Sequence, residues 1–281
     1  MRLIKMTGGL GNQMFIYAFY LQMRHRFPKT RIDLSDMMHY NAHNGYELHR
    51  IFDLPQDEVC WPRWLKKVME FLLFKVIVER KQNLDTLNAF QCNYLWPFIY
   101  FKGFYQSERF FKEIEEEIHS SFRFNLNKAN DYSKKMAELI QKDEHSVSLH
   151  VRRGDYISPK FYARFGSVCQ LTYYERAIQK ILSADPNAHF YIFSDDIRWV
   201  EEQLHLPHYT IIDGNHGDDS WQDMMLMSFC RRHIIANSTF SWWGAWLDNR
   251  PGKMVIAPQK WLGDREMPHI IPQEWIKIAT D

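Results

Sequence analysis

The feature that most constrains the fold is an alternation in the second half of the chain, where short β-branched apolar runs take turns with stretches of helical periodicity. This order predicts a parallel sheet with helices on its faces, because parallel strands need crossover connections and these are usually helices. The helical segments carry apolar residues at i, i+3, i+4 and i+7 from Tyr174 to Leu182 and from Trp221 to Phe229. The expected strands are residues 146–151, 188–193, 209–212, 233–236 and 253–257.

The first half of the chain opens with the same kind of unit. A strand over residues 2–6 runs into the glycine-rich turn TGGLGNQ, a buried helix is expected over 14–27, and another strand over 30–34. The segment from 39 to 96 is less regular and includes a basic and aromatic stretch over 61–81. The opening pattern favours a second doubly wound domain.

We therefore expect an α/β protein with two doubly wound domains, since 281 residues exceed the usual size of one domain. The N-terminal, acceptor-side domain would span residues 1–142 and the C-terminal, Rossmann-like domain residues 143–265, with 266–281 as a C-terminal tail. Open parallel sheets bind ligands outside the carboxyl ends of their strands. The informative motifs should accordingly follow strands.

The segment HVRRGDY follows the expected strand over 146–151 and carries the strongest chemical signal. Arg152 and Arg153 have planar guanidinium groups that suit bidentate contact with phosphate oxygens, and Gly154 lets the chain turn beside them. Asp155 is a candidate for orienting an arginine, binding a sugar hydroxyl or acting as a base. The net charge of +1 gives no general attraction for anions, so an anion must be bound locally and nucleic acid is not expected. A surface turn held by an Arg–Asp pair is the alternative.

The segment FSDD ends the next expected strand. Ser194 and Asp195 should face the same ligand, because neighbouring parallel strands end at one edge of a sheet. Asp195 or Asp196 also begins a helix, where a carboxylate caps free N–H groups, and capping alone is the favoured role for one of them. The spacing is not the Asp-x-Asp box of metal-dependent sugar transferases, so no metal site is predicted.

The segment NSTFSWWGAWL begins at Asn237, where a strand ends, and continues into a helix capped by Ser238 or Thr239. Backbone N–H groups at such a helix start bind anions without a formal charge, and the hydroxyls add donors. Together with Arg152 they would hold a diphosphate from two sides. A capped helix with a buried Trp-rich face is the alternative.

The segment GGLGNQMF fails the dinucleotide-binding pattern, because Met14 stands where a third glycine would follow Gly9 and Gly11. A nicotinamide enzyme is therefore disfavoured. The two glycines allow a ligand to approach the backbone, and Asn12 and Gln13 offer neutral hydrogen-bonding groups at a helix start.

These four segments together resemble the bacterial α-1,2-fucosyltransferases of glycosyltransferase family 11, in the correct order from about residue 6 to residue 247. The resemblance implies a GT-B-type fold with two Rossmann-like domains facing a cleft, and neither metal nor cofactor. It also implies inverting transfer of L-fucose from GDP-β-L-fucose to the 2-hydroxyl of a terminal galactose in a glycan, with release of GDP.

The resemblance also implies individual roles. Arg152 would hold the β-phosphate, His150 would lie near the ribose or base, and Asp223 would accept hydrogen bonds from guanine. Arg152, Asp155 and Asn12 are the catalytic candidates. The donor-binding candidates are Gly9, Gly11, Gln13, His150, Arg153, Ser194, Asp195, Asp223, Asn237, Ser238, Thr239, Phe240 and Ser241.

The catalytic base stays open at the sequence level. In a single displacement the acceptor hydroxyl attacks the anomeric carbon as GDP leaves, and positive charge stabilises the leaving phosphate. Asp155 is the carboxylate inside the strongest motif, but its nearness to Arg152 would make it a poor proton acceptor. The alternative is late proton loss assisted by Asn12, Gln13 or water.

Other features bear on location. The four cysteines lack disulfide or zinc spacing and no signal peptide is apparent, which predicts a cytoplasmic protein. The stretch over 61–81 has two interpretations, a buried helix with a solvated basic edge, which is favoured, or a peripheral contact with the inner face of an anionic membrane. Histidines 39, 43 and 49 lack the helical spacing of a metal site and are expected in loops or on the acceptor side.

Two other functions remain as alternatives. The chain could transfer fucose to another position or to a protein hydroxyl, because residues that bind phosphate do not recognise the acceptor. It could also be a silent carbohydrate-binding protein, against which the intact set of Arg152, Asp155 and Ser238 argues. The natural acceptor and the oligomeric state are not encoded in any motif.

Overall fold

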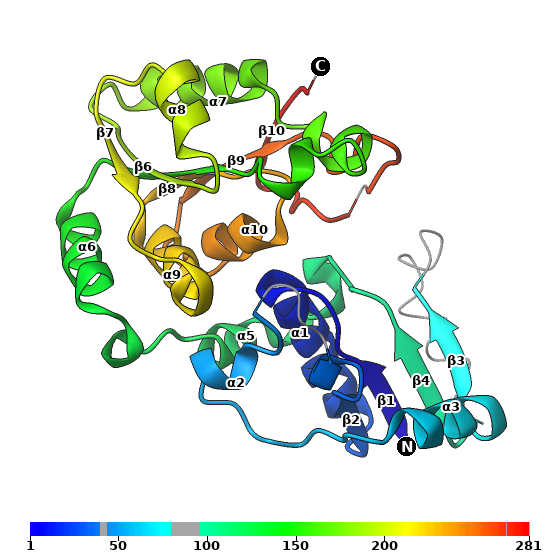
Figure 1. Ribbon diagram of the computed structural model, residues 1–281. Coiled ribbons are helices and arrows are strands. Elements are labelled where there is room, and N and C mark those ends of the chain that lie inside the picture. Colours follow the sequence, from blue (N-terminus) through cyan, green and yellow to red (C-terminus); the bar gives the residue numbers. More distant parts are fainter. Residues whose placement is uncertain (40–43, 80–95, 268, 281) are drawn as a thin grey trace. The chain divides into compact units, whose positions relative to one another are not determined.

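The computed structural model describes residues 1–39, 44–79, 96–267 and 269–280. The chain divides into two compact units, Met1–Phe124 and Asn125–Asp281, each built on a parallel sheet (Figure 1). The boundary lies before helix α6 (Asp131–Lys142), which the sequence interpretation assigned to the first domain. This helix belongs to the second unit because it packs against α9 (Trp221–Phe229).

The first unit has a four-stranded sheet in the order β2-β1-β4-β3, in which all neighbours run parallel. Its strands are β1 (Arg2–Lys5), β2 (Thr30–Asp33), β3 (Lys75–Val78) and β4 (Ile99–Lys102). Its described helices include α1 (Leu10–Arg26), α2 (Leu48–Ile51), α3 (Arg63–Leu72) and α5 (Glu115–Ser121).

Helices α1 and α3 cover opposite faces of this sheet. Phe19 of α1 packs edge-on against Phe101 of β4, with ring centroids 5.8 Å apart. The preceding residue, Tyr100, points to the other face and packs with Leu3 and with Met69 of α3. Helix α1 is buried along nearly its whole length, as its apolar sequence predicted, although it begins four residues before the expected residue 14.

The stretch over 61–81 is not the expected buried helix. Helix α3 ends at Leu72 and is followed by strand β3, while residues 80 and 81 lie outside the described ranges. Lys66 is the buried residue of α3, whereas Phe71 is 89% exposed. The expectation was wrong because it assumed that the apolar side of the helix packs on the protein, and the polar side does so instead.

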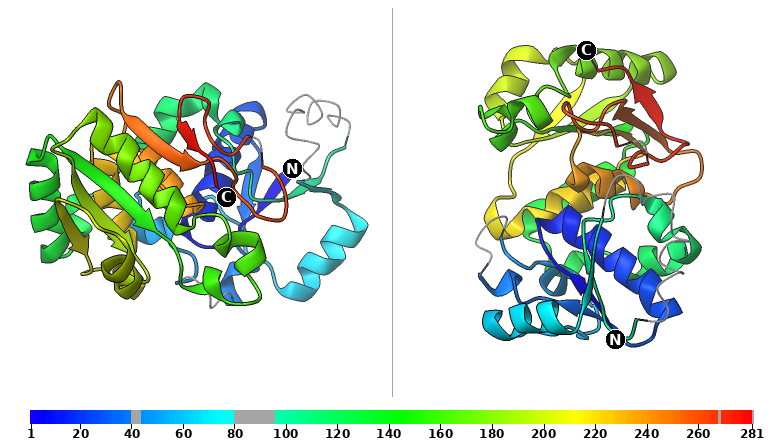
Figure 2. Two further views of the ribbon diagram at one scale, coloured as in Figure 1. Left: turned by 90° about the horizontal axis from the view of Figure 1, so that it is seen from above. Right: turned by 90° about the vertical axis from the view of Figure 1, so that its right-hand side faces the viewer.

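The second unit has a six-stranded parallel sheet in the order β10-β9-β8-β5-β6-β7. Its strands are β5 (Ser146–Val151), β6 (His189–Ser194), β7 (Tyr209–Ile212), β8 (Arg232–Ile234), β9 (Met254–Pro258) and β10 (Ile276–Ile278). Helices α7 (Leu171–Ala184) and α8 (Ile197–Gln203) cover one face, and α9 and α10 (Thr239–Trp246) cover the other (Figures 1 and 2).

The five strands expected in the second half are present, with ends that differ by at most two residues. Strand β10 was not expected, because it lies in the segment predicted to be a tail, and it pairs with β9. Residues 266–281 are therefore part of the second sheet's unit rather than a separate tail. None of the helices in the described ranges has the length and apolar character needed to span a bilayer.

The strand order of the second unit places a topological switch point between β5 and β8. From β5 the chain moves outward through β6 to β7, then returns to the other side of β5 and continues through β8, β9 and β10. Ligands of doubly wound sheets bind outside the carboxyl ends of the strands at such a point. The residues that follow β5 and β8 are therefore the first to consider.

Candidate functional site

Arg152 follows β5 at the switch point and is held between two carboxylates. Its Nη2 donates to Asp155 Oδ1 at 2.6 Å, and its Nη1 lies 2.7 Å from Asp195 Oδ2. Burial alone would lower the pKa of Arg152, but the negative charges of Asp195 and Asp155 raise it. The guanidinium therefore stays cationic and has a fixed orientation.

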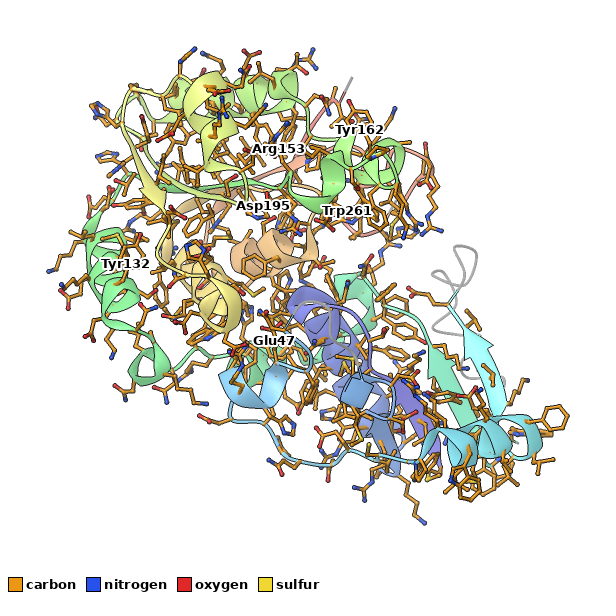
Figure 3. The ribbon with its side chains drawn as sticks, in the orientation of Figure 1. Glu47, Tyr132, Arg153, Tyr162, Asp195 and Trp261 are labelled. Carbon is orange, nitrogen blue, oxygen red and sulfur yellow. The ribbon has the colours of Figure 1, made fainter. Side chains whose placement is uncertain are left out.

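Arg153 is fixed by the end of β6. Its backbone N–H donates to Asp195 Oδ1 at 2.8 Å and its Nε donates to Asp196 Oδ2 at 3.0 Å (Figure 3). The guanidinium also lies over the ring of Trp199, 4.4 Å from its centroid. Asp196 caps α8 by accepting from the N–H of Trp199, as expected for one of the two aspartates. Capping is not its only role, however, because it also binds Arg153.

Gly154 leaves room for the carboxylate of Asp195. A Cβ atom at this position would lie 2.5 Å from Asp195 Oδ2, far inside van der Waals contact. The sequence interpretation assigned Gly154 to a sharp turn, and the structure adds that the missing side chain leaves room for a carboxylate that binds both arginines. Ser194 contributes to the same turn by accepting a hydrogen bond from the N–H of Asp196 at 3.0 Å.

The cluster carries more negative than positive charge. Two arginines, Arg152 and Arg153, face three carboxylates, those of Asp155, Asp195 and Asp196, which gives a formal sum of −1. An anion at this edge therefore cannot rely on arginine charge alone. It needs the neutral N–H donors of a helix N-terminus as well.

Such a helix begins after β8. Ser238 is the N-cap of α10, and its Oγ accepts from the N–H of Phe240 at 3.3 Å. Ser241 is buried and its hydroxyl donates to the carbonyl of Ser238 at 3.3 Å, so it serves the helix rather than facing outward. Thr239 and Phe240 are half-buried at the helix start. The expected Trp-rich buried face of the helix is present, since Trp242 and Trp243 are fully buried.

The segments after β5 and β8 are joined directly. Tyr156 donates from its hydroxyl to the carbonyl of Asn237 at 3.4 Å, and the ring of His150 lies 6.1 Å from that of Phe240. Asn237 Nδ2 donates to the carbonyls of Phe165 and Trp261 at 3.0 and 3.1 Å. The motifs HVRRGDY and NSTFSWWGAWL therefore lie next to each other at the carboxyl edge of the sheet.

Two buried polar atoms at the switch point lack a hydrogen-bond partner among the described residues, and these are His150 Nδ1 and Asn237 Oδ1. Burial, together with the nearby charge of Arg152, lowers the pKa of His150 to about 3, so its ring is neutral. Unsatisfied buried polar atoms are costly and rare in folded proteins. Their occurrence on both sides of the switch point leaves hydrogen-bonding capacity that a polar ligand could use.

Asp223 lies at the start of α9, near the carboxyl end of β7. Its Oδ1 accepts from Asn215 Nδ2 at 2.8 Å, and Asn215 is oriented in turn by Asn130 and Ser133, each 3.0 Å from its Oδ1. Burial raises the pKa of Asp223 to about 7. The sequence interpretation missed Asn215 and Asn130. Asn215 could have been found, because it is a polar residue that closely follows the end of β7.

Residues 65–279 match the sequence model of Glycosyl transferase family 11. The chain belongs to this family. It is therefore a glycosyltransferase, and the family expected from the four motifs is confirmed.

Relatives of this glycosyltransferase include two Escherichia coli proteins that align over nearly their whole length. One is an alpha-1,2-colitosyltransferase, 32% identical over 98% of this chain and 97% of that protein. The other is the O-antigen biosynthesis glycosyltransferase WbnK, 29% identical over 97% and 99%. Galactoside alpha-(1,2)-fucosyltransferase 1 of Ateles belzebuth is 25% identical over 66% of this chain and 54% of its own length.

Solved structures share the fold of this glycosyltransferase at low identity. Fucosyltransferase NodZ from Bradyrhizobium is 13% identical, with a TM-score of 0.52 over 86% of this chain and 90% of that one. A mutant FUT1 of Arabidopsis thaliana in complex with GDP is 11% identical, with a TM-score of 0.51 over 91% and 69%. The expected α/β, GT-B-type fold with parallel sheets is confirmed.

The glycine-rich turn of this glycosyltransferase lies in the first unit. Gly9 is the N-cap of α1, and Gly11 lies within its first turn. Gln13 is fully buried. Its Nε2 donates to the carbonyls of Gly8 and Gly45 at 2.9 and 2.7 Å, and its Oε1 accepts from the N–H of Glu47. These contacts give Gln13 a structural role in its own unit.

Asn12 and His49 also have partners within the first unit. Asn12 Oδ1 accepts from Gln106 Nε2 at 2.6 Å, which fixes the orientation of its amide. His49 lies in helix α2 rather than in a loop and pairs with Glu58 at 2.5 Å, while His43 lies outside the described residues. Among the described residues, no three His, Cys, Asp or Glu side chains are grouped so that they could hold a metal ion.

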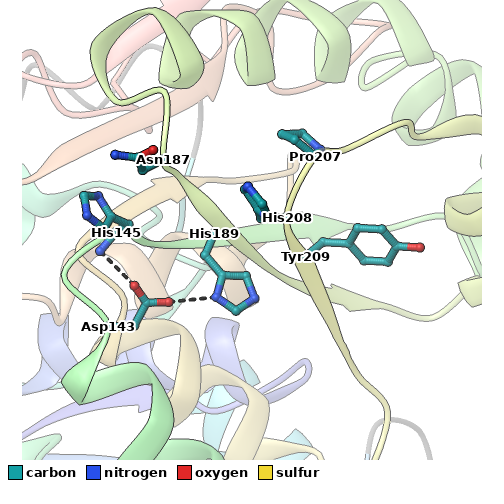
Figure 4. Close-up of a pocket in the computed structure, with 7 residues that line it drawn as sticks. All are labelled: Asp143, His145, Asn187, His189, Pro207, His208 and Tyr209. Atoms are coloured by element: carbon teal, nitrogen blue, oxygen red, sulfur yellow. Dashed lines mark hydrogen bonds and ion pairs between the residues drawn. The ribbon is translucent and has the colours of Figure 1, made fainter.

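The family 11 chain also has a cavity at the opposite, amino edge of the second sheet. It has a volume of about 570 Å³ and is lined by Asp143, His145, Asn187, His189, Pro207, His208 and Tyr209 (Figure 4). Asp143 Oδ2 accepts from His189 Nδ1 at 2.9 Å and from the Tyr191 hydroxyl at 3.0 Å. These polar groups hold the strand starts together, far from the edge to which parallel sheets bring their ligands.

Proposed function

We propose that the chain is an inverting galactoside 2-α-L-fucosyltransferase, which transfers L-fucose from GDP-β-L-fucose to the 2-hydroxyl of a terminal galactose. The observation that carries the proposal is the pairing at the switch point of Arg152, after β5, with the Ser238-capped helix α10, after β8. The names of the alpha-1,2-colitosyltransferase and the galactoside alpha-(1,2)-fucosyltransferase relatives support the linkage.

In this proposal the diphosphate binds between Arg152 and the N-terminus of α10. Arg152 has five N–H donors and uses one at each of its two carboxylate contacts, so others remain for a phosphate oxygen. The helix start adds backbone N–H groups without adding charge. His150 Nδ1 and Asn237 Oδ1 would gain partners from the phosphate, ribose or bound water.

Asp223 would select the base. A guanine presents adjacent N1–H and N2–H donors, which match the two oxygens of one carboxylate. The network from Asn130 through Asn215 orients the Asp223 carboxylate before any ligand binds. The other donor-side residues stay predictions, and these are Gly9, Gly11, Gln13, Arg153, Ser194, Asp195, Thr239, Phe240 and Ser241.

The chemical step requires stabilisation of the charge that develops on the departing GDP. Arg152 and the N–H groups of α10 supply it, so we propose that transfer needs neither metal nor cofactor. The acceptor oxygen attacks the anomeric carbon as the bond to the phosphate oxygen breaks, which inverts the configuration. The acceptor proton passes to a base or to water.

We assign Asp155 as a counter-ion of Arg152 in preference to a base. Its Oδ1 is already 2.6 Å from Arg152 Nη2, so this oxygen is occupied by the arginine rather than directed at an acceptor hydroxyl. Late proton loss, assisted by water, Asn12 or Gln13, is the remaining route. Asn12 and Arg152 therefore both stay catalytic candidates.

A second candidate is colitosyl transfer, favoured by the 32% identical E. coli relative. Colitose is fucose without its 3-hydroxyl. A pocket that hydrogen-bonds this hydroxyl would reject the colitose donor by roughly 10⁴-fold, whereas a pocket without such a partner would discriminate weakly. The two donors therefore give clearly different results in one assay.

The test is transfer from GDP-fucose and from GDP-colitose to a panel of galactosides, free and lipid-linked, with the product linkage determined. We expect α-1,2-fucosyl galactosides, with turnover unchanged by a chelator. A product linked elsewhere, or preference for GDP-colitose, would replace the fucosyl assignment. Loss of activity in chelator with recovery on adding manganese would disprove the metal-free mechanism. A cytoplasmic location and a role in lipopolysaccharide or capsule assembly belong to the same proposal.

A further inference from the structure

Helix α3 of the first unit presents its apolar side to solvent. Trp64, Val68, Phe71 and Leu72 stand at i, i+4, i+7 and i+8, so they form one face of the helix, and they are 68%, 44%, 89% and 67% exposed. Leu73 continues this surface at 42% exposed, and its carbonyl accepts from the indole of Trp96. Contiguous apolar surface of this kind marks an interaction site.

The opposite side of α3 fixes this orientation. Lys66 is buried, and its Nζ lies 3.3 Å from Asp33 Oδ2 and 2.8 Å from Asp36 Oδ2. Although burial alone would raise it, hydrogen bonds from Lys5 and Lys66 lower the pKa of Asp36 to about 2, so it stays ionised. Asp33 is itself buried and accepts from the Tyr100 hydroxyl at 2.6 Å.

A second ion pair acts one turn further along the helix, where Glu70 lies 2.5 Å from Lys102 of β4. Rolling α3 to bury Trp64 and Phe71 would separate both pairs and leave the buried Asp33 without its cation, which is strongly unfavourable. The exposed apolar face is therefore a stable feature of the unit.

The charges beside the apolar face are positive. Arg63 and Lys67 are exposed, and Lys67 lies one turn from both Trp64 and Phe71. The acidic residue of the helix, Glu70, is neutralised by Lys102. A partner that fits this surface offers an apolar interior below a layer of negative charge.

We propose that α3 is a membrane-docking helix that lies in the interface of an anionic lipid bilayer. Trp64, Phe71 and Leu72 would enter the boundary between headgroups and acyl chains, while Arg63 and Lys67 meet lipid phosphates. The indole of Trp64 favours this depth, because it is an apolar ring system with a polar N–H group. This inference does not depend on which sugar is transferred.

The experiment is co-sedimentation of the full chain with vesicles of phosphatidylcholine alone, or with about one phosphatidylglycerol in three lipids. We expect binding to the anionic vesicles only, weakened by salt. The double variant W64S/F71S should bind roughly a hundredfold more weakly. The charge variant R63E/K67E should bind roughly tenfold more weakly or worse.

Matched controls come from the second unit. The variant L139S/Y209S removes two side chains that are 54% and 49% exposed, and K135E/K180E reverses two exposed lysines. Both should bind as the wild type does, and all four variants should keep wild-type turnover on a soluble acceptor. That turnover shows that W64S/F71S is folded.

Several outcomes would overturn the proposal. One is an absence of vesicle binding by the wild type, and another is equal binding to both vesicle types. A third is binding that W64S/F71S leaves intact. If the wild type does not bind vesicles and is a dimer in solution, and if the substitutions W64S/F71S make it a monomer, the face is covered by a second copy of the chain instead.

Discussion

The two edges of the sheet in the second unit carry similar residue types, but they pair them differently. At the amino edge, Asp143 accepts from His189 and Tyr191, and Asp185 pairs with both His145 and Arg232. At the carboxyl edge, arginines and aspartates also pair, yet buried atoms of His150 and Asn237 have no partner among the described residues.

This difference distinguishes polar residues that stabilise the fold from polar residues that are available to bind a ligand. The amino edge has a cavity of about 570 Å³, but its buried acceptors are paired within the protein. The carboxyl edge has unused hydrogen-bonding capacity and a helix N-terminus at a topological switch point. Buried atoms without a hydrogen-bond partner also occur at the amino edge, in Arg231 and Arg232 at the start of β8. The combination of such atoms with a helix N-terminus at the switch point, rather than their presence alone, distinguishes the carboxyl edge.

The strongest test of this comparison is to replace one arginine at each edge with alanine. Arg152→Ala should lower kcat/KM by roughly a thousandfold or more, because it removes charge stabilisation of the leaving diphosphate. Arg232→Ala removes an arginine of similar exposure, 25% against 31%, which pairs with Asp185 at 3.1 Å. It should lower the melting temperature and leave kcat/KM within about twofold.

Steady-state kinetics and thermal unfolding of the two variants decide the matter. If Arg152→Ala keeps near-normal turnover, or if both variants lose activity to the same extent, the two edges are not functionally distinct.

The helix at the carboxyl edge can be tested without disturbing its start. Ser238→Gly removes the hydroxyl but keeps a residue that is well tolerated at an N-cap, so unfolding should change by only a few tenths of a kcal/mol. The affinity for GDP should fall by roughly tenfold, because a hydrogen bond to a charged ligand is lost. Isothermal titration measures this affinity, and an unchanged value would assign the hydroxyl to capping alone.

The two edges also hold carboxylates with opposite pKa shifts. Burial raises the pKa of Asp223 to about 7. Burial alone would also raise the pKa of Asp185, but hydrogen bonds from His145 and neighbouring groups lower it. Guanine needs the ionised form of Asp223, so KM for the donor should rise as pH falls below 7, by roughly tenfold at pH 6. Asp223→Asn should abolish this pH dependence.

The same shift has a consequence for stability. Because the folded pKa of Asp223 lies above its unfolded value, its contribution to stability is fully present below the unfolded pKa and is lost as pH rises through about 7. Asp223→Asn should therefore be more stabilising, or less destabilising, at pH 8 than at pH 5. Thermal unfolding at both values, with no donor present, provides the measurement.

The smallest effect is expected for Asp155→Asn. If Asp155 is a counter-ion of Arg152, the substitution removes one negative charge from the cluster and should lower KM for the donor by roughly threefold with kcat nearly unchanged. A hundredfold loss of kcat at saturating donor would instead identify Asp155 as the base.

Much of the second unit was predictable because its strands are apolar runs between amphipathic helices, and because the polar residues of β5 and β8 follow those strands directly. Local patterns could not reveal contacts between distant residues, such as the pairing of β10 with β9 or the orientation of Asn215 by Asn130. Helix α3 was misjudged for a physical reason. Its apolar periodicity is real, but buried ion pairs of Lys66 decide which side meets the sheet.

Gly244 of α10 allows this helix to pack closely against α9. A Cβ atom at Gly244 would lie 2.9 Å from Cβ of Met227 in α9, so the two helix backbones pack close together. One helix begins beside Asp223 and the other at Ser238. On the proposed function, the distance from nucleobase to phosphate is thus set by the scaffold before any donor arrives. A sugar nucleotide with a single phosphate would leave one end of this span empty, so donor length is discriminated together with donor chemistry.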